Sequence, residues 1–251
     1  MNTELVSKTV PNKTYFNNVL CNLVEDEIIT LDEKVKSLDN LNAEQLIIYI
    51  ARVSSSRDNK LEDYEELLNY LINNAHWSPF EHAYMTIEIE TSRAIGRQLI
   101  RHRSFTFQEF SQRYSKALNF EDIELREQPE NNRQSSGELV DPYILGHHHG
   151  EVSSIIKDHL EIDVMCLYET LLEKGVAREC ARMILPECTT TTIYMTGNIR
   201  SWLAFLNIRL DHHAQKEIRI VAEEIANILK NEFPIITEAT KTFNNYSGNF
   251  M

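Results

Sequence analysis

The chain has 251 residues and a formal net charge of −13 at pH 7, and 42% of its residues are hydrophobic. This length favours one large domain, residues 1–251, with a substantial core. The acidic balance argues against general nucleic-acid binding, which depends on broad neutralisation of phosphates by cations. No apolar run approaches the length needed to cross a bilayer, so no membrane association is expected.

Several common signals are absent from the sequence. The first residues, Met1–Glu4, lack the charged and then apolar pattern of a secretory signal. The four cysteines show no two-residue spacing and no dense framework, which is typical of the reducing cytoplasm. The seven glycines form neither a G-x-G-x-x-G nor a Walker-type loop. A bound nucleotide would therefore have to be held by arginines and helix ends.

The first half of the chain predicts helices followed by a strand. Residues 43–53 predict a mostly buried helix with Asn42 as its N-cap, and apolar residues over 61–71 recur at helical spacing. Residues 83–90 alternate between apolar and polar, which predicts a half-buried strand. After residue 92 the helical spacing returns.

The second half begins with a polar stretch, residues 119–150, which reads as a long excursion from the domain. A helix over 151–174 would return the chain to the core. Residues 189–196 are rich in β-branched side chains and predict a second strand, after which Asn198 can cap a helix. A last amphipathic helix is predicted over 214–229. Helices and strands mixed without regular alternation favour an α+β fold.

The most informative segment concentrates positive charge in an acidic protein. Between positions 93 and 113 five arginines stand against Glu109 as the single acid: Arg93, Arg97, Arg101, Arg103 and Arg113. Guanidinium groups bind phosphate through paired hydrogen bonds and keep their charge at any cellular pH. The spacing of four between the first three predicts one helical stripe. A solvated face with ion pairs is the alternative, but few acids lie nearby in the sequence, so we expect a small-anion site.

Other catalytic patterns are not found. Ser111 lacks the G-x-S-x-G elbow of a nucleophile, so a hydrogen bond to a ligand is the better reading. Neither H-E-x-x-H nor a His-Asp dipeptide occurs, so no metal site is expected, and His147–His149 reads as a surface tract. A metal-dependent nucleotide phosphohydrolase and a nucleic-acid-binding protein that uses the arginine-rich helix remain alternatives.

A series of motifs in chain order resembles the flavin-dependent thymidylate synthases, over roughly residues 45–235. The series comprises His76-x-Ser-Pro-Phe-Glu-His82, Arg101-His-Arg103 with Ser111 and Arg113 following, Gly175-Val-x-Arg-Glu-x-Ala-Arg182, Asn198-x-Arg200-Ser201 and Asn207-x-Arg209-x-Asp211-x-His213-Ala-Gln215. The segments Ala51–Ser54, Arg126-x-Gln128 and Asn132–Gln134 are also similar to the family.

The resemblance implies an α+β subunit of a homotetramer, with a central antiparallel sheet flanked by helices. It also implies bound FAD, which accepts a hydride from NADPH. The reaction would transfer a one-carbon unit from methylenetetrahydrofolate to dUMP and reduce it, releasing dTMP and tetrahydrofolate. No enzyme cysteine needs to attack the uracil, which agrees with the lack of a nucleophile motif.

The resemblance assigns roles to residues by position. Those expected at FAD are Ser78, Arg101, His102, Arg103, Glu109, Asn198, Ile199 and Arg200. Those expected at the nucleotide are Gln98, Arg101, Glu109, Phe110, Ser111, Gln112, Arg113, Arg182 and Arg209. Arg209 would lie against the uracil as the catalytic residue and favour its ionised form. Ala204 stands where an amide often reaches the flavin in the family, so that hydrogen bond would be absent.

Overall fold

The computed structural model describes residues 1–25, 30, 39, 41–54, 64–116, 119–130, 136–146 and 149–240. The chain forms two compact units, each assembled from three stretches. Unit 1 comprises Met1–Glu4, Glu88–Met195 and Ile208–Glu224. Unit 2 comprises Leu5–Ile87, Thr196–Asn207 and Ile225–Met251. That these units act as one domain stays a prediction.

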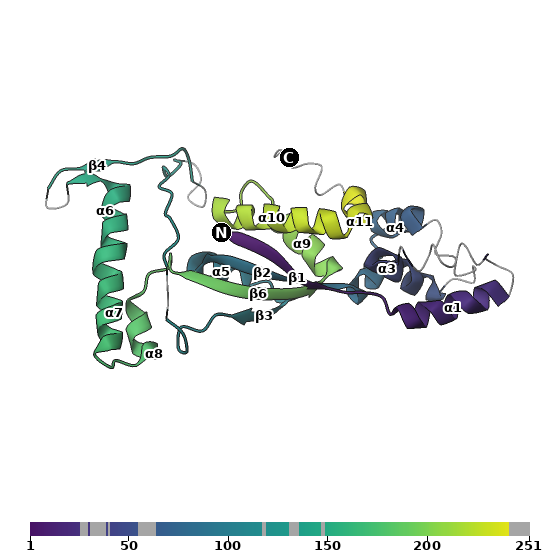
Figure 1. Ribbon diagram of the computed structural model, residues 1–251. Coiled ribbons are helices and arrows are strands. Elements are labelled where there is room, and N and C mark those ends of the chain that lie inside the picture. Colours follow the sequence, from purple (N-terminus) through teal and green to yellow (C-terminus); the bar gives the residue numbers. More distant parts are fainter. Residues whose placement is uncertain are drawn as a thin grey trace. The chain divides into compact units, whose positions relative to one another are not determined.

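The fold combines helices with an antiparallel sheet, as predicted (Figure 1). The four strands are β1 (Asn2–Lys8), β2 (Tyr84–Ser92), β6 (Thr190–Asn198) and β3 (Thr106–Glu109), in the order β1-β2-β6-β3. Alternate residues of β2 are buried, among them Met85, Ile87 and Ile89, because successive side chains of a strand point to opposite faces. The two long predicted strands are thus confirmed, whereas β1 and β3 carried no clear signal.

Unit 2 contains the helices α1 (Lys13–Glu25), α3 (Ala43–Ala51), α4 (Tyr64–Asn73) and α11 (Pro234–Ala239), together with the 3-10 turns Arg52–Ser54 and Ser78–His82. Asn42 caps α3 as predicted: its side-chain oxygen accepts the Gln45 backbone N–H at 3.0 Å, and the Gln45 side chain accepts that of Asn42. Phe16 and Leu20 of α1 form a cluster on which Tyr49 packs. Leu61 and Asn132–Gln134 lie outside the described residues.

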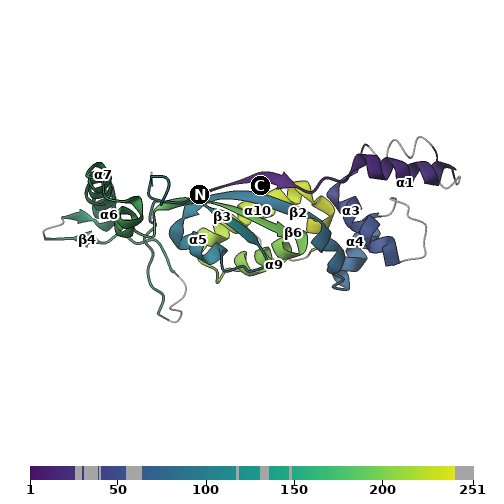
Figure 2. The ribbon, with the colours of Figure 1, turned by 90° about the horizontal axis from the view of Figure 1, so that it is seen from below.

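Unit 1 contains a helical rod that Figure 1 draws without interruption and that Figure 2 shows nearly end-on. It runs through α6 (Val152–Asp158), a π-helical turn (His159–Val164) and α7 (Met165–Glu173), which confirms the predicted helix over 151–174. The chain then turns at Gly175, which has a positive φ of 81°, and forms α8 (Arg178–Ala181) and a 3-10 turn (Arg182–Ile184).

The first helix of unit 1, α5 (Arg93–Leu99), is shorter than the sequence suggested. Its apolar face is as predicted, because Ile95 and Leu99 are buried. However, the helix ends at Leu99, so Arg101 lies in the following turn and the expected stripe of three arginines is wrong. Only Arg93 and Arg97 share the helix.

Two helices follow β6 and complete the core. Asn198 caps α9 (Ile199–Arg209), and its side-chain oxygen accepts the Ser201 backbone N–H at 2.8 Å. Trp202 is buried on this helix, as expected. The helix α10 (Lys216–Glu232) confirms the last predicted helix. No helix in the described part of the chain combines the length and apolar character needed to span a membrane.

The described residues of the polar excursion include several short paired segments. An isolated antiparallel bridge joins Phe120 to Thr189, the residue before β6, and a second bridge joins Arg126 to Leu139 within the excursion. The short strands β4 (Tyr143–Ile144) and β5 (Gly150–Glu151) form a separate antiparallel pair. Within the surface tract that the sequence suggested, only His149 is among the described residues, and its Nε2 lies 2.9 Å from the Tyr143 hydroxyl.

A buried acid in unit 2 should make stability depend on pH. Glu44 is 1% exposed, and burial raises the pKa of its carboxyl from 4.5 to about 7, although it accepts the Ile236 backbone N–H at 2.9 Å. The contribution of this residue to stability is therefore full below pH 4.5 and is lost as the pH rises through 7. Between pH 4.5 and 7 the free energy of unfolding should therefore fall less in Glu44→Gln than in the parent protein. We expect a difference of roughly 1–3 kcal/mol, measured by urea unfolding at each pH.

Glu66→Gln is the matched control, because Glu66 lies exposed on α4. It should leave the pH profile unchanged. Equal slopes between pH 4.5 and 7 for the parent and Glu44→Gln proteins would contradict the proposed titration of Glu44.

Candidate active site

A cavity of about 220 Å³ in unit 1 brings together several residues that the sequence predicted. Its lining is Arg93, Glu109, Phe110, Ser111, Gln112 and Arg182. Phe110 extends the pairing of β3 by donating its backbone N–H to Thr192 at 2.9 Å. The chain then turns at Ser111, whose carbonyl accepts the Tyr114 N–H at 3.1 Å. This strand end and turn place the consecutive residues 109–112 at one cavity.

Hydrogen-bond donors dominate the cavity. Arg93 Nη1 donates to Gln112 Oε1 at 2.8 Å, which leaves the amide NH₂ group of Gln112 for another partner. Gln112 is 3% exposed, and its Nε2 atom is buried with no hydrogen-bond partner in the described part of the chain. An orphaned buried donor is costly unless a ligand satisfies it. With Ser111 and Arg182 alongside, the arrangement suits a ligand rich in acceptor oxygens, such as a phosphate.

Glu109 is the exception in this cavity. Its Oε1 accepts a hydrogen bond from the Thr191 hydroxyl at 3.0 Å. A carboxylate repels a phosphate, so Glu109 suits a different part of a ligand that offers hydroxyl or N–H donors. The cavity therefore has one end suited to an oxyanion of the ligand and another end, at Glu109, suited to hydrogen-bond donors of the ligand.

A second group of predicted residues gathers around Arg209, also in unit 1. Arg209 Nε donates to His102 Nε2 at 2.9 Å, and its Nη2 lies 3.5 Å from the Gln98 carbonyl oxygen. No ion pair joins Arg209 to an acid among the described residues. Burial, and then the nearby positive charge of Arg101, lower the pKa of the Arg209 guanidinium. The cation is therefore held by neutral acceptors and keeps its charge uncompensated.

His102 is the neutral partner in this pair. Burial, and then the positive charge of Arg209, lower the pKa of its imidazole from 6.5 to about 4. At neutral pH the ring is uncharged, so its Nε2 can accept the hydrogen bond from Arg209. The stability contributed by the neutral His102 ring is present above pH 6.5 and is lost as the pH falls through 4.

The side chain of Gln98 is positioned by a residue with no assigned role. Gln98 Nε2 donates to Gln215 Oε1 at 2.7 Å. Burial acts to raise the pKa of Glu217, but hydrogen bonds, first from Arg126 and to a smaller extent from the Gln215 amide, lower this pKa overall. Gln215 was part of a recognised motif, but the sequence alone did not indicate that it contacts Gln98.

Acids from distant segments neutralise some of the predicted arginines. Arg97 pairs with Glu187 at 2.6 Å, and Arg113 pairs with Glu179 at 3.4 Å. Few acids lie near this segment in the sequence, but the fold supplies acids that are remote in sequence, so the alternative of ion pairs holds for Arg97 and Arg113. Arg101 and Arg103 are exposed, and neither forms an ion pair with an acid in the described ranges.

Four residues predicted at the cofactor lie in unit 2. Ser78 begins a 3-10 turn and is exposed, and Asn198 is the cap of α9. Ile199 is buried and donates its backbone N–H to Ala83 at 2.9 Å. Arg200 forms an ion pair with Glu81.

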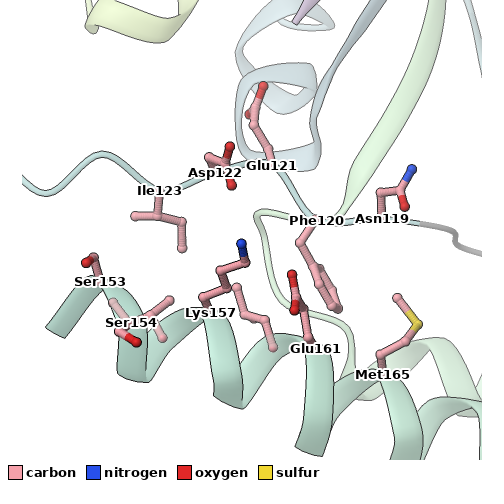
Figure 3. A pocket seen from close by; sticks show the side chains of 12 residues that line it. Asn119, Phe120, Glu121, Asp122, Ile123, Ser153, Ser154, Lys157, Glu161 and Met165 are labelled. Atoms are coloured by element: carbon pink, nitrogen blue, oxygen red, sulfur yellow. The ribbon is translucent and has the colours of Figure 1, made fainter. Parts of the chain in front are cut away.

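Two further features of unit 1 contain no predicted site residue. A larger cavity, about 640 Å³, lies between residues 119–123 and the helical rod. In Figure 3 the Phe120 ring points toward the rod, and the Lys157 side chain extends from the rod toward the segment 119–123. On the surface, ligand atoms of Asp211, His212 and His213 lie within 4.8 Å of one another. Asp211 also accepts the His213 backbone N–H at 2.8 Å, so it shapes the turn before α10, and the absence of a metal site stays a prediction.

The fold and the site together define an α+β protein with a cavity suited to an oxyanion. The family described as "Thymidylate synthase complementing protein" matches residues 37–235. The chain belongs to this family of flavin-dependent thymidylate synthases.

Relatives and solved structures agree with this assignment. The chain is 41% identical to a flavin-dependent thymidylate synthase of Synechocystis, over 84% of this chain and 95% of the relative. It is 42% identical to a probable flavin-dependent thymidylate synthase of Paramecium bursaria Chlorella virus 1, over 78% and 90% of the two chains. A UMP/dUMP methylase from Streptomyces cacaoi bound with 5-Br dUMP is 25% identical, with a TM-score of 0.64 over 95% of this chain and 93% of that one.

The cavity predicts a specific role for Arg182 in binding a nucleoside monophosphate. Replacement by Gln removes a charge-assisted hydrogen bond, so we expect Arg182→Gln to weaken binding roughly tenfold or more. The dissociation constant can be measured by isothermal titration calorimetry.

Arg178→Gln is the matched control, since Arg178 is exposed on α8 four residues earlier and does not line the cavity. Equal losses in both variants would show only a general effect of positive charge. That outcome would remove Arg182 from the phosphate site.

Proposed function

We propose that the protein converts dUMP to dTMP, with methylenetetrahydrofolate as one-carbon donor, NADPH as reductant and FAD as bound cofactor. The observation that carries this proposal is the donor-lined cavity in a chain of this family. At about 220 Å³ it is smaller than pockets that enclose a whole ligand, which are about 300–1,000 Å³. It suits the phosphate end of a nucleotide.

The nucleotide would be held from both ends of this cavity. Its phosphate carries close to two negative charges and would accept from Ser111, Gln112 and Arg182. Arg113 would join them by exchanging its exposed pair with Glu179 for the phosphate, because exposed ion pairs contribute little stability. Glu109 would accept from a donor group elsewhere on the ligand, and Phe110, which lines the same cavity, would offer apolar contact.

The residues assigned to FAD have the chemistry that a flavin dinucleotide requires. Arg101 and Arg103 are exposed cations without an acid partner in the described part of the chain, and they would bind the pyrophosphate. Ser78, Asn198, Ile199 and Arg200 would supply hydroxyl, amide, main-chain and guanidinium contacts. When bound, FAD supplies the hydride chemistry, while the protein supplies binding, orientation and field.

Arg209 would act by stabilising negative charge on the uracil. Its guanidinium is fixed by His102 and by the Gln98 carbonyl, both neutral, so its charge is not already neutralised by a carboxylate. A cation fixed before the reaction stabilises developing charge without reorganisation. Since burial strengthens electrostatic interactions, the partly buried position of Arg209 favours this role.

The remaining assignments are the assembly and the compartment. We propose a homotetramer located in the cytoplasm, without nucleic acid or membrane as a partner. Apolar side chains such as Ile162 and Leu167 are exposed on the helical rod of unit 1, and a contact between subunits would bury this apolar surface.

The test of the function is formation of dTMP by the purified full-length protein. With FAD, dUMP, methylenetetrahydrofolate and NADPH we expect dTMP and tetrahydrofolate, detected by chromatography, and flavin absorbance that remains with the protein. Omission of dUMP, methylenetetrahydrofolate or NADPH, or removal of the bound FAD, should abolish the product. Absence of dTMP from the complete mixture, with FAD and dUMP both bound, would overturn the proposal.

Arg209→Ala should fold normally and reduce turnover about 10²–10³-fold, the effect typical of losing one preorganised charge stabiliser. Steady-state dTMP formation measures the loss. Arg219→Ala is the control, because Arg219 lies on α10 and pairs only loosely with Glu223, at 3.9 Å. Near-normal synthesis by Arg209→Ala would exclude Arg209 from the mechanism.

A further inference from the structure

Arg93 lines the phosphate cavity, yet the family resemblance assigns it no role. Its position is fixed by the main chain: the Arg93 N–H donates to the Thr189 carbonyl, and the Ala94 N–H donates to the Glu187 carbonyl, each at 3.0 Å. Arg93 is the first residue of α5, and Gln112 follows the end of β3. The two side chains thus meet from different elements, 19 positions apart in sequence.

The chemistry of the pair fixes the orientation of the Gln112 amide. A guanidinium only donates hydrogen bonds, whereas an amide has an accepting oxygen and a donating NH₂ group. With Arg93 beside it, Gln112 must turn its oxygen toward Arg93, as the distance of 2.8 Å from Nη1 to Oε1 shows. Its NH₂ group must then donate to some other acceptor, and the described part of the chain provides none.

We propose that Arg93 is a positioning residue of the nucleotide site, which holds the Gln112 amide as a donor toward the phosphate of dUMP. This inference rests on the proposed function. A neutral side chain at position 93 would let the amide rotate, and half of its orientations would then present an oxygen to the phosphate. Arg93 therefore fixes the Gln112 amide in the orientation that donates a hydrogen bond to the phosphate, and this makes the cavity selective for oxyanions.

The matched control lies one turn further along the same helix. Arg97 has the same side chain, but it pairs with Glu187 and does not line the cavity. Arg93→Gln should weaken dUMP binding by the full-length protein with FAD about tenfold, as expected when a hydrogen bond to a charged group is lost. Arg93→Lys retains a donor-only side chain and should preserve most of the affinity, and Arg97→Gln should preserve all of it.

A double-mutant cycle separates positioning from direct contact with the phosphate. If Arg93 acts through Gln112, adding Arg93→Gln to a Gln112→Met protein should change dUMP affinity by less than about twofold. A full additive loss would show that Arg93 contacts the phosphate directly, and an unchanged affinity in Arg93→Gln alone would show no role. Either result overturns the inference.

A variant of Gln112 provides an independent test should the Arg93 variants fail to fold. Gln112→Glu keeps the size of the side chain and the bond from Arg93, but presents only acceptor oxygens to the phosphate. It should therefore bind dUMP more weakly than Gln112→Met, and equal or tighter binding would contradict the inference. Failure of the parent protein to bind dUMP would instead overturn the proposed function.

Discussion

The site depends on arginines whose charge is held in place by neutral groups. Arg93 donates to the Gln112 amide, and Arg209 donates to His102 and approaches the Gln98 carbonyl. Neither pairs with a carboxylate among the described residues, so no acid of the protein there neutralises either charge. Desolvated charges without a partner are costly, which explains why such an arrangement is found at a binding site rather than in the core.

Other arginines of the same segment are used differently. Arg97 and Arg113 are more than half exposed, and they pair with Glu187 and Glu179. Exposed pairs of this kind contribute little to stability, and they can open at small cost when a ligand competes. In an acidic protein they also limit how far positive charge extends over the surface. The result is a small cationic cavity instead of a broad basic field, which agrees with a small anionic ligand.

Local sequence signals predicted much of the fold, and long-range contacts account for what they missed. Asn42 and Asn198 were predicted as caps because capping depends on residues within one turn. The alternation through Met85, Ile87 and Ile89 likewise predicted β2. The arginine motifs indicated an anion site, but the acids that pair with Arg97 and Arg113 come from residues some 66–90 positions away. Arg93 was noticed only as part of a charge run, since its contact with Gln112 needs the register of α5 against the end of β3.

The neutrality of His102 is what allows Arg209 to remain a free cation. A protonated imidazole would have no lone pair for the Arg209 N–H and would add a like charge beside it. Burial and the charge of Arg209 itself keep the pKa of His102 near 4. Arg209 therefore favours the neutral form of His102, which is the form that can accept its hydrogen bond. A carboxylate in place of His102 would hold Arg209 more tightly, but would neutralise the charge that a uracil ring needs. The contact of Arg209 with neutral His102 is thus weaker than an ion pair would be, and this leaves the charge of Arg209 for its contact with the uracil.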